Sequence, residues 1–281
     1  MRVAFLGPAG TFTEEALRAS IRGDAEQVPL ATVREAVMAV QAGDVDRAVV
    51  PIENALEGSV RATLDTLAGD APDVRIEAQV TWPIHHCLIA TRADSLDAVT
   101  RVVSHPQAMS QCRRFLAERL AHAQRVAATS TAEAVRLVSA ADEPWAAIGS
   151  RLSAERYGCE VLAEHVEDRS DNLTRFVWLA PIGPAGESPL APIDAPTKTS
   201  VVFWGFDDDS PGALVGVLSE LARRGVNLTK IESRPRRVRL GHYMFFADLD
   251  GAVSDGAVRD ALEALGRRVE TLRVLGSYPA G

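Results

Sequence analysis

The chain has 281 residues, of which 47% are hydrophobic and 24% are charged, and its formal net charge is −8. This is the composition of a globular protein with room for two domains. The acidic balance argues against non-specific nucleic-acid binding, and no apolar run is long enough to span a membrane. We expect a cytoplasmic protein, because the N-terminus lacks a secretory signal pattern and the three cysteines are widely spaced without a CxxC pair.

Strand and helix patterns alternate through the first 181 residues. This alternation predicts mostly parallel sheets covered by helices, with ligands bound beyond the carboxyl ends of the strands. The expected elements are a strand at 2–7, helices at 12–21 and 34–44, a strand at 47–53, a helix at 60–69, extended chain at 74–90, strands at 99–105, 124–130, 145–150 and 159–168 alternating with helices at 108–121, 131–140 and 151–158, and a last strand at 173–180.

A proline-rich stretch separates this region from a second one. Residues 180–198 contain five prolines and two glycines without hydrophobic periodicity, as in a semi-rigid linker. We therefore divide the chain into residues 1–181, a linker at 182–198 and a second region at 199–281. The second region reads as strand, helix, two strands, helix and strand, which is the βαββαβ order of a ferredoxin-like domain.

The turn after the first strand is the first candidate binding element. Thr11 and Glu14 have the spacing of a capping box, and Gly7 and Gly10 let backbone amides approach a ligand closely. The turn has neither the lysine of a phosphate loop nor the GxGxxG spacing of a dinucleotide-binding fold. On these residues alone, a plain tight turn and an anion site both remain open.

Two further polar groups follow predicted strands. Glu53 and Asn54 end the strand at 47–53, where they are either solvated loop residues or part of a binding edge. Ser104 and Gln107 have the spacing of a second cap around Pro106, which fits the first turn of a helix because proline lacks an N–H there. Both groups are expected at the carboxyl ends of strands, where a cleft would lie.

A fourth group, around Thr174 and Arg175, lies at the mouth of the last strand of the first region. Arginine is the side chain that best binds a carboxylate bidentately, and helix N-termini also attract anions. His105 and the pair His85 and His86 lack metal-ligand spacing, so no metal is expected. Together these groups predict a cleft for a small molecule that carries carboxylates.

These segments resemble the motifs of a known family. The stretches "GPAGTFTEEA" at 7–16, "PIENALEGSV" at 51–60, "SHPQAMSQC" at 104–112 and "DNLTRF" at 171–176 are similar, in this order, to those of prephenate dehydratases. After the linker, "PGALVGVLSELARRGVNLTKIESRP" and the strand pattern that follows it resemble the ACT regulatory domain of that family. The resemblance covers almost the whole chain except the proline-rich linker.

The resemblance implies an α/β catalytic domain at 1–181 with the two-lobed fold of type II periplasmic binding proteins. Lobe 1 would cover about 1–79 and a return segment near 175–181, lobe 2 about 80–174, and the ACT domain 199–281. It also implies the reaction: prephenate loses water and carbon dioxide to give phenylpyruvate in L-phenylalanine biosynthesis, without metal or organic cofactor. Subunits would self-associate through their ACT domains, as a dimer or a tetramer.

The resemblance also assigns roles to residues. A threonine hydroxyl is a weak acid, so two groups are candidates for donating the proton to the leaving hydroxyl, and both are expected to be catalytic: Thr174 and Glu53. The residues expected to bind substrate are Thr11, Asn54, Ser104, Gln107, Arg175 and Phe176, and the family pattern leaves open whether the cation of Arg175 binds substrate or is structural. The residues expected to bind phenylalanine as allosteric ligand are Gly212, Ala213, Leu214, Val215, Glu232, Ser233, Arg234 and Pro235.

Two alternatives remain beside this interpretation. An arogenate dehydratase would act on a substrate with an amine where prephenate has a keto group. A non-catalytic amino-acid-binding sensor would have the same fold without the reaction. The sequence departs from the family at Ala55, where serine or threonine commonly follows the "PIEN" run.

Overall fold

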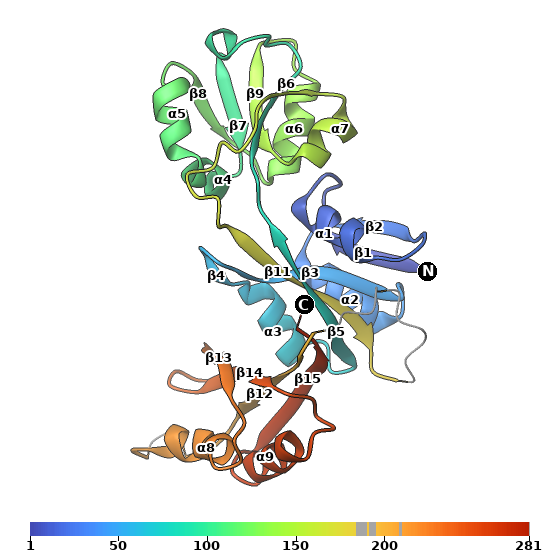
Figure 1. Cartoon of the computed structure of the whole chain (residues 1–281), viewed down its shortest axis with the longest axis vertical. Helices are drawn as coiled ribbons and strands as arrows, with labels where there is room; N and C mark the ends of the chain where they lie inside the picture. Colours follow the sequence, from blue (N-terminus) through green and yellow to red (C-terminus); the bar gives the residue numbers. More distant parts are fainter. Residues whose placement is uncertain (184–189, 191–194, 208–209, 281) are drawn as a thin grey trace.

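The residues that the computed structural model describes, 1–183, 190, 195–207 and 210–280, form three β-sheets that follow one another along the length of the molecule (Figure 1). The sheet built from the N-terminal residues lies in the middle. A second sheet lies at one end, and the C-terminal sheet lies at the other. The predicted linker at 182–198 falls largely outside the described residues, and the first strand after it already begins at Thr197.

The central sheet has the strand order β2-β1-β3-β11-β5, with the short β4 paired to β3. β1 runs parallel to β2 and β3, whereas β11 runs antiparallel to β3 and β5. The elements of this part are β1 (Arg2–Leu6), α1 (Phe12–Ser20), β2 (Glu26–Leu30), α2 (Val33–Ala42), β3 (Arg47–Asn54), β4 (Gly58–Ser59), α3 (Arg61–Gly69), β5 (Val74–Pro83) and β11 (Leu173–Pro181).

Helix α2 illustrates why the predicted helices form. Thr32 accepts a hydrogen bond from the amide of Glu35, whose carboxylate accepts one from the amide of Thr32, so the helix begins with a capping box. Gly43 ends the helix in the left-handed conformation, with φ of 77°. The buried side chains recur at helical spacing and anchor α2 on the sheet: Val33, Ala36, Val37 and Val40.

The second sheet has the strand order β10-β6-β9-β7-β8, with an apolar core on each of its faces. The chain enters it through residues 84–86, after β5, and leaves it through residues 164–172, before β11. Its elements are β6 (Cys87–Ala90), a 3-10 turn (Leu96–Ala98), β7 (Arg101–Ser104), α4 (Pro106–Gln111), α5 (Arg113–Arg119), β8 (Gln124–Ala127), α6 (Thr131–Ser139), β9 (Trp145–Gly149), α7 (Arg151–Tyr157) and β10 (Glu160–Ala163).

The C-terminal sheet has the order β13-β14-β12-β15, and all its pairs are antiparallel. Val201 and Phe203 of β12 face the core beneath helices α8 and α9, whereas Val202 between them packs into the core of the central domain. This confirms the βαββαβ plan. The elements are β12 (Thr197–Trp204), α8 (Ala213–Ala222), β13 (Leu228–Pro235), β14 (Tyr243–Asp250), α9 (Gly256–Gly266) and β15 (Thr271–Pro279).

The predicted fold class, two α/β lobes followed by a ferredoxin-like domain, is confirmed. The prediction of mostly parallel sheets is wrong, because the strands that carry the chain between the lobes run antiparallel to their neighbours. The sequence analysis did not predict strand β2, which contains Pro29 and lies at the sheet edge, where proline is tolerated. Residues 80–83 and 173–174 belong to strands of the central sheet, so we propose residues 84–172 as lobe 2.

Candidate active site

A cavity of about 240 Å³ lies between the central sheet and the second sheet. Its wall combines hydroxyls, side-chain amides and two histidines with a few apolar side chains, and no Asp, Glu, Lys or Arg lines it among the described residues. The lining residues are Leu6, Gly7, Thr11, Phe12, Thr13, Pro51, Asn54, Ile84, His86, His105, Gln107, Ala108, Gln111, Thr129, Ser130, Thr131, Asn172, Thr174 and Phe176.

The strand pair β3 and β11 divides the predicted site residues between two faces. Asn54 lies opposite Thr174 and Glu53 opposite Arg175 in the register of the two strands. Because successive strand residues point to opposite faces, Asn54, Thr174 and Phe176 reach the cavity while Glu53 and Arg175 point away from it. Glu53 and Arg175 therefore do not line this cavity, and their expected contacts with substrate stay a prediction.

Hydrogen bonds fix the direction in which the Thr174 hydroxyl donates. The Oδ1 atom of Asn54 accepts the amides of Leu56 and Glu57, both at 3.0 Å, so its Nδ2 atom must face the other way. That Nδ2 donates to Oγ1 of Thr174 at 2.9 Å and to Oδ1 of Asn172 at 2.8 Å. The Thr174 oxygen is therefore an acceptor toward Asn54, and its proton is free to donate into the cavity.

The same polar chain continues across the cavity to His86. Asn172 donates to Oε1 of Gln111 at 3.2 Å, and Nε2 of His86 lies 3.0 Å from that oxygen, so Nε2 carries the ring proton. Burial lowers the pKa of His86, which holds the ring neutral. Its Nδ1 has no hydrogen-bond partner among the described residues. The sequence analysis gave none of these three residues a role in the substrate site: His86 was considered only as a metal ligand, and Gln111 and Asn172 stand inside the quoted motifs.

Positive potential in the cavity comes from helix ends rather than from side chains. Helices α1 and α6 both begin at the cavity wall, and the first-turn amides of a helix have no partner within it. Ser130 caps α6 by accepting from the amide of Glu133. Each terminus carries roughly half a positive charge, so the cavity suits an anion without a lysine or arginine.

The predicted cap at Thr11 is wrong in its details. The Thr11 hydroxyl donates to the carbonyl of Leu6 at 3.0 Å and makes no capping bond. The buried carboxylate of Glu14 instead accepts from the amide of Gly10 at 2.6 Å. Thr11 nevertheless lines the cavity, so its place in a substrate site remains a proposal.

The predicted cap at Ser104 is also wrong. Its hydroxyl is fully buried and donates to the carbonyl of Ile148 at 2.8 Å, so it does not reach the cavity. The residue that caps α4 is His105, whose Nδ1 accepts from the amide of Gln107 at 3.3 Å. His105 and Gln107 both line the cavity.

Comparison with known proteins assigns the chain. The family model described as prephenate dehydratase matches residues 3–182, and that of the ACT domain matches residues 208–267. The chain belongs to the prephenate dehydratase family. A relative named prephenate dehydratase, from Mycolicibacterium vanbaalenii, is 41% identical over 99% of this chain and 91% of its own.

Solved structures agree with this assignment. The crystal structure of a prephenate dehydratase from Arthrobacter aurescens in complex with L-Phe has a TM-score of 0.89 and 40% identity, and covers 99% of this chain and 90% of its own. The structure of GqqA, described as a novel type of quorum quenching acylase, has a TM-score of 0.86 and 30% identity over 100% of this chain and 98% of its own.

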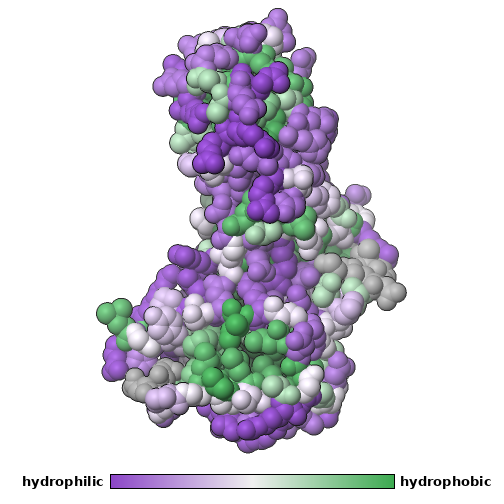
Figure 2. Space-filling view, turned by 60° about the vertical axis from the view of Figure 1, so that its left-hand side comes forward, coloured by the Kyte–Doolittle hydropathy of each residue, from purple (hydrophilic) through white to green (hydrophobic). Residues whose placement is uncertain are grey.

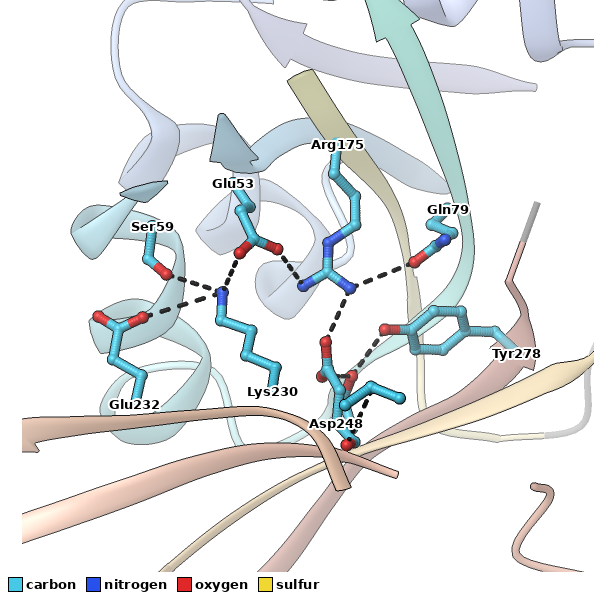
Figure 3. Close-up of polar contacts among 10 residues, drawn as sticks. Glu53, Ser59, Gln79, Arg175, Lys230, Glu232, Asp248 and Tyr278 are labelled. Atoms are coloured by element: carbon cyan, nitrogen blue, oxygen red, sulfur yellow. Dashed lines mark hydrogen bonds and ion pairs between the residues drawn. The ribbon is translucent and has the colours of Figure 1, made fainter. Parts of the chain in front are cut away.

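The side chains that point away from the cavity bind the ACT domain (Figure 3). Glu53 lies 3.1 Å from the guanidinium of Arg175 and 3.2 Å from the ammonium of Lys230 on β13. Arg175 also donates to Asp248 of β14 at 2.8 Å. Burial alone would lower the pKa of the Arg175 guanidinium. The nearby groups of Asp248, Tyr278 and Glu53 have the opposite and larger effect, so this pKa is raised.

The ACT end of this network is buried. Ser200 donates to the Asp248 carboxylate at 2.5 Å, so the hydroxyl of Tyr278, 2.6 Å away, donates to Ser200. Burial, followed by the charge of Asp248, raises the pKa of Tyr278 to about 12. The three side chains therefore form a hydrogen-bonded chain from Tyr278 through Ser200 to Asp248, which in turn binds Arg175.

This raised pKa predicts a pH dependence of stability. An unfolded tyrosine ionises near pH 10 and folded Tyr278 near pH 12, so the free energy of unfolding falls as pH rises through this window, by about 3 kcal/mol in all. Urea unfolding of the parent chain and of Tyr278→Phe at pH 9 and pH 11 measures the difference. Equal pH slopes in the two proteins would contradict the assignment.

The residues expected to bind phenylalanine lie on two elements of the ACT domain. Gly212, in the left-handed conformation, and residues 213–215 begin α8, and Val215 is 66% exposed. Residues 232–235 lie on β13, at the edge of the sheet. Arg234 points to the catalytic domain, where it donates bidentately to Asp65 of α3.

Proposed function

We propose that this chain is a carbon–oxygen lyase that converts prephenate into phenylpyruvate, carbon dioxide and water. Membership of the family and the cavity between the lobes both support this activity. The observation that carries the proposal is the hydroxyl of Thr174, whose oxygen accepts from Asn54 while its proton is free toward the cavity. This donor can serve the leaving oxygen of the substrate, and turnover decides between an enzyme and a sensor.

The difficult step of the reaction is the cleavage of the ring C–O bond, because hydroxide is a poor leaving group. As the ring carboxylate leaves as carbon dioxide, its bonding electron pair enters the ring, which becomes aromatic, and the ring C–O bond breaks. The oxygen leaves as hydroxide and takes up one proton to give water. We assign Thr174 to donate a hydrogen bond to this oxygen, because stabilising a poor leaving group lowers the barrier. Glu53 is not assigned as the donor, since it is paired with Arg175 and Lys230 on the other face.

The charge of the cavity supports prephenate over arogenate. The remaining carboxylate of the substrate would accept from the first-turn amides of α1 and α6. An ammonium group needs an acceptor of negative charge, and no carboxylate lines the cavity among the described residues. The keto group of prephenate, by contrast, matches the hydroxyl and amide donors of the wall.

We also propose that L-phenylalanine regulates the enzyme through residues 212–215 and 232–235 of the ACT domain. A similar protein was solved in complex with L-Phe. The ion pairs of Lys230 and Asp248 provide a physical link from β13 and β14 to β3 and β11, the strands that carry Asn54 and Thr174. Binding that moves these ACT strands would change the position of the cavity residues.

Self-association through the ACT domain is supported by its surface. Figure 2 shows hydrophobic residues gathered on the lower part of the molecule, where the ACT domain lies. Strand β13 is an edge strand, and an exposed edge with apolar side chains favours pairing with another chain. The exposed large hydrophobic residues of this domain are Val215, Ile231, Val238, Leu240, Tyr243 and Val274.

A cytoplasmic location completes the proposal. The three cysteines form no disulfide among the described residues, which fits a reducing compartment. No helix in the described part of the chain is long and apolar enough to cross a membrane.

Turnover of the two candidate substrates tests the assignment. Purified chain is expected to release phenylpyruvate from prephenate, and kcat/KM for arogenate is expected to be at least ~10-fold lower because its ammonium would be unpaired. Ultraviolet absorbance follows phenylpyruvate, and amino-acid analysis follows phenylalanine formed from arogenate. A higher kcat/KM for arogenate would make the chain an arogenate dehydratase. If neither substrate is turned over, the proposal is overturned in favour of a non-catalytic amino-acid-binding sensor.

A further inference from the structure

The two segments that connect the lobes bring together three potential metal ligands. His85 follows β5 in the first connection, and His165 and Glu167 precede β11 in the second. The two connections run side by side between the second sheet and the central sheet (Figure 1). Sequence spacing predicted no metal here, because the partners of His85 are 80 or more residues away in the chain.

The three ligand atoms form a nearly equilateral triangle. Nδ1 of His85 lies 2.9 Å from Oε1 of Glu167 and 3.2 Å from Nδ1 of His165, and Nδ1 of His165 lies 3.4 Å from the same oxygen. Zinc bonds of about 2.0–2.1 Å in tetrahedral geometry put neighbouring ligand atoms about 3.3–3.4 Å apart. The triangle therefore has the size of one face of a zinc coordination tetrahedron.

The surroundings orient these ligands and leave a fourth position accessible. The second oxygen of Glu167 accepts from the amide of His86 at 2.9 Å, which turns the first oxygen toward the histidines. The Glu167 side chain is 2% exposed, whereas those of His85 and His165 are 39% and 62% exposed. His85 and His165 also line a cavity of about 250 Å³ whose wall includes Glu15 and Glu164.

We propose that His85, His165 and Glu167 bind a divalent transition-metal ion, with zinc as the preferred ion, and that the ion ties the two lobe connections together. Two imidazoles with one carboxylate are a ligand set that zinc and its neighbours favour over magnesium or calcium. None of the three ligands lines the active-site cavity, so the ion does not contact the substrate. Because the ion joins the two connections between the lobes, it restrains movement of one lobe against the other rather than taking part in the chemical step.

Titration of the full chain with Co²⁺ tests the site. After treatment with EDTA, the protein is expected to bind one Co²⁺ per chain, with visible absorption bands of a low-coordinate nitrogen and oxygen site that Zn²⁺ abolishes. His85→Ala and His165→Ala are each expected to weaken binding at least ~100-fold, since loss of a residue that merely orients a ligand already costs 10–100-fold. Both side chains are partly exposed, so these variants are expected to fold.

His122→Ala is the matched control, because His122 is exposed and lies outside the cluster. Its Co²⁺ affinity and spectrum are expected to equal those of the parent chain, and its thermal melt is compared with those of the other variants. Failure of the parent chain to bind Co²⁺ or Zn²⁺ would overturn the proposal. Unchanged affinity in both His85→Ala and His165→Ala would do the same, whatever the turnover of prephenate.

Discussion

Replacing Thr174 with alanine is expected to lower kcat for prephenate by about 10²–10⁴-fold, with a much smaller change in KM. The variant removes the hydroxyl whose proton is directed into the cavity by the amide of Asn54. The hydrogen bond to the leaving oxygen gains strength as negative charge develops on it, so its loss falls on the transition state. Steady-state kinetics by phenylpyruvate absorbance measures the effect.

Two variants make this test specific. Thr174→Ser keeps the hydroxyl and is expected to retain kcat within about tenfold of the parent chain. Asn54→Asp keeps the size of the side chain but offers Thr174 an acceptor in place of a donor, so the Thr174 proton turns toward residue 54 and kcat falls with it. A Thr174→Ala variant with kcat within a few-fold of the parent would remove Thr174 from the mechanism.

Replacing Arg175 with methionine is expected to lower the free energy of unfolding by about 3–5 kcal/mol. Methionine preserves much of the apolar stem but leaves the Asp248 carboxylate, 8% exposed, without its cation. Glu53 loses one of its two partners at the same time. Urea unfolding followed by circular dichroism and by tryptophan fluorescence measures the loss across both domains.

A second arginine at the same domain contact serves as control. Arg237 lies 2.7 Å from Asp65 of the catalytic domain, but its side chain is 74% exposed. Arg237→Met is therefore expected to cost less than about 1 kcal/mol. If the two substitutions cost the same, burial of the Arg175 pair would not be a source of stability.

The order of strands and helices could be predicted from periodicity for most of the chain, and this fixes the fold class. Strand β2 was missed; it is short, it contains Pro29, and it lies at the edge of the sheet, where proline is tolerated. The direction of the returning strands was predicted wrongly, since the alternation of strands and helices was taken to mean parallel pairing throughout. The direction follows from the path of the chain: β5 leads out of the central sheet and β11 leads back into it, so the two strands run antiparallel.

The candidate site was predicted in part. Its motifs do meet at one cavity, because Thr11, Asn54, Gln107, Thr174 and Phe176 all line it. The strand period of two, however, already implies that Thr174 and Arg175 cannot both face a single cavity, and this was not applied. The partners of Arg175 could not be found from the sequence, since Asp248 lies 73 residues further along the chain.

The two dipeptides at the edge of the cavity, Glu53-Asn54 and Thr174-Arg175, have a consequence for exchanging domains between relatives. In each dipeptide, one residue serves the cavity and its neighbour binds the ACT domain. A chimera that joins this catalytic domain to a foreign ACT domain must therefore match positions 230 and 248 to Glu53 and Arg175. A mismatch at these contacts would disturb Glu53 or Arg175, each of which is the sequence neighbour of a cavity residue, Asn54 or Thr174. Joining the two domains correctly therefore depends on these contacts as well as on the linker.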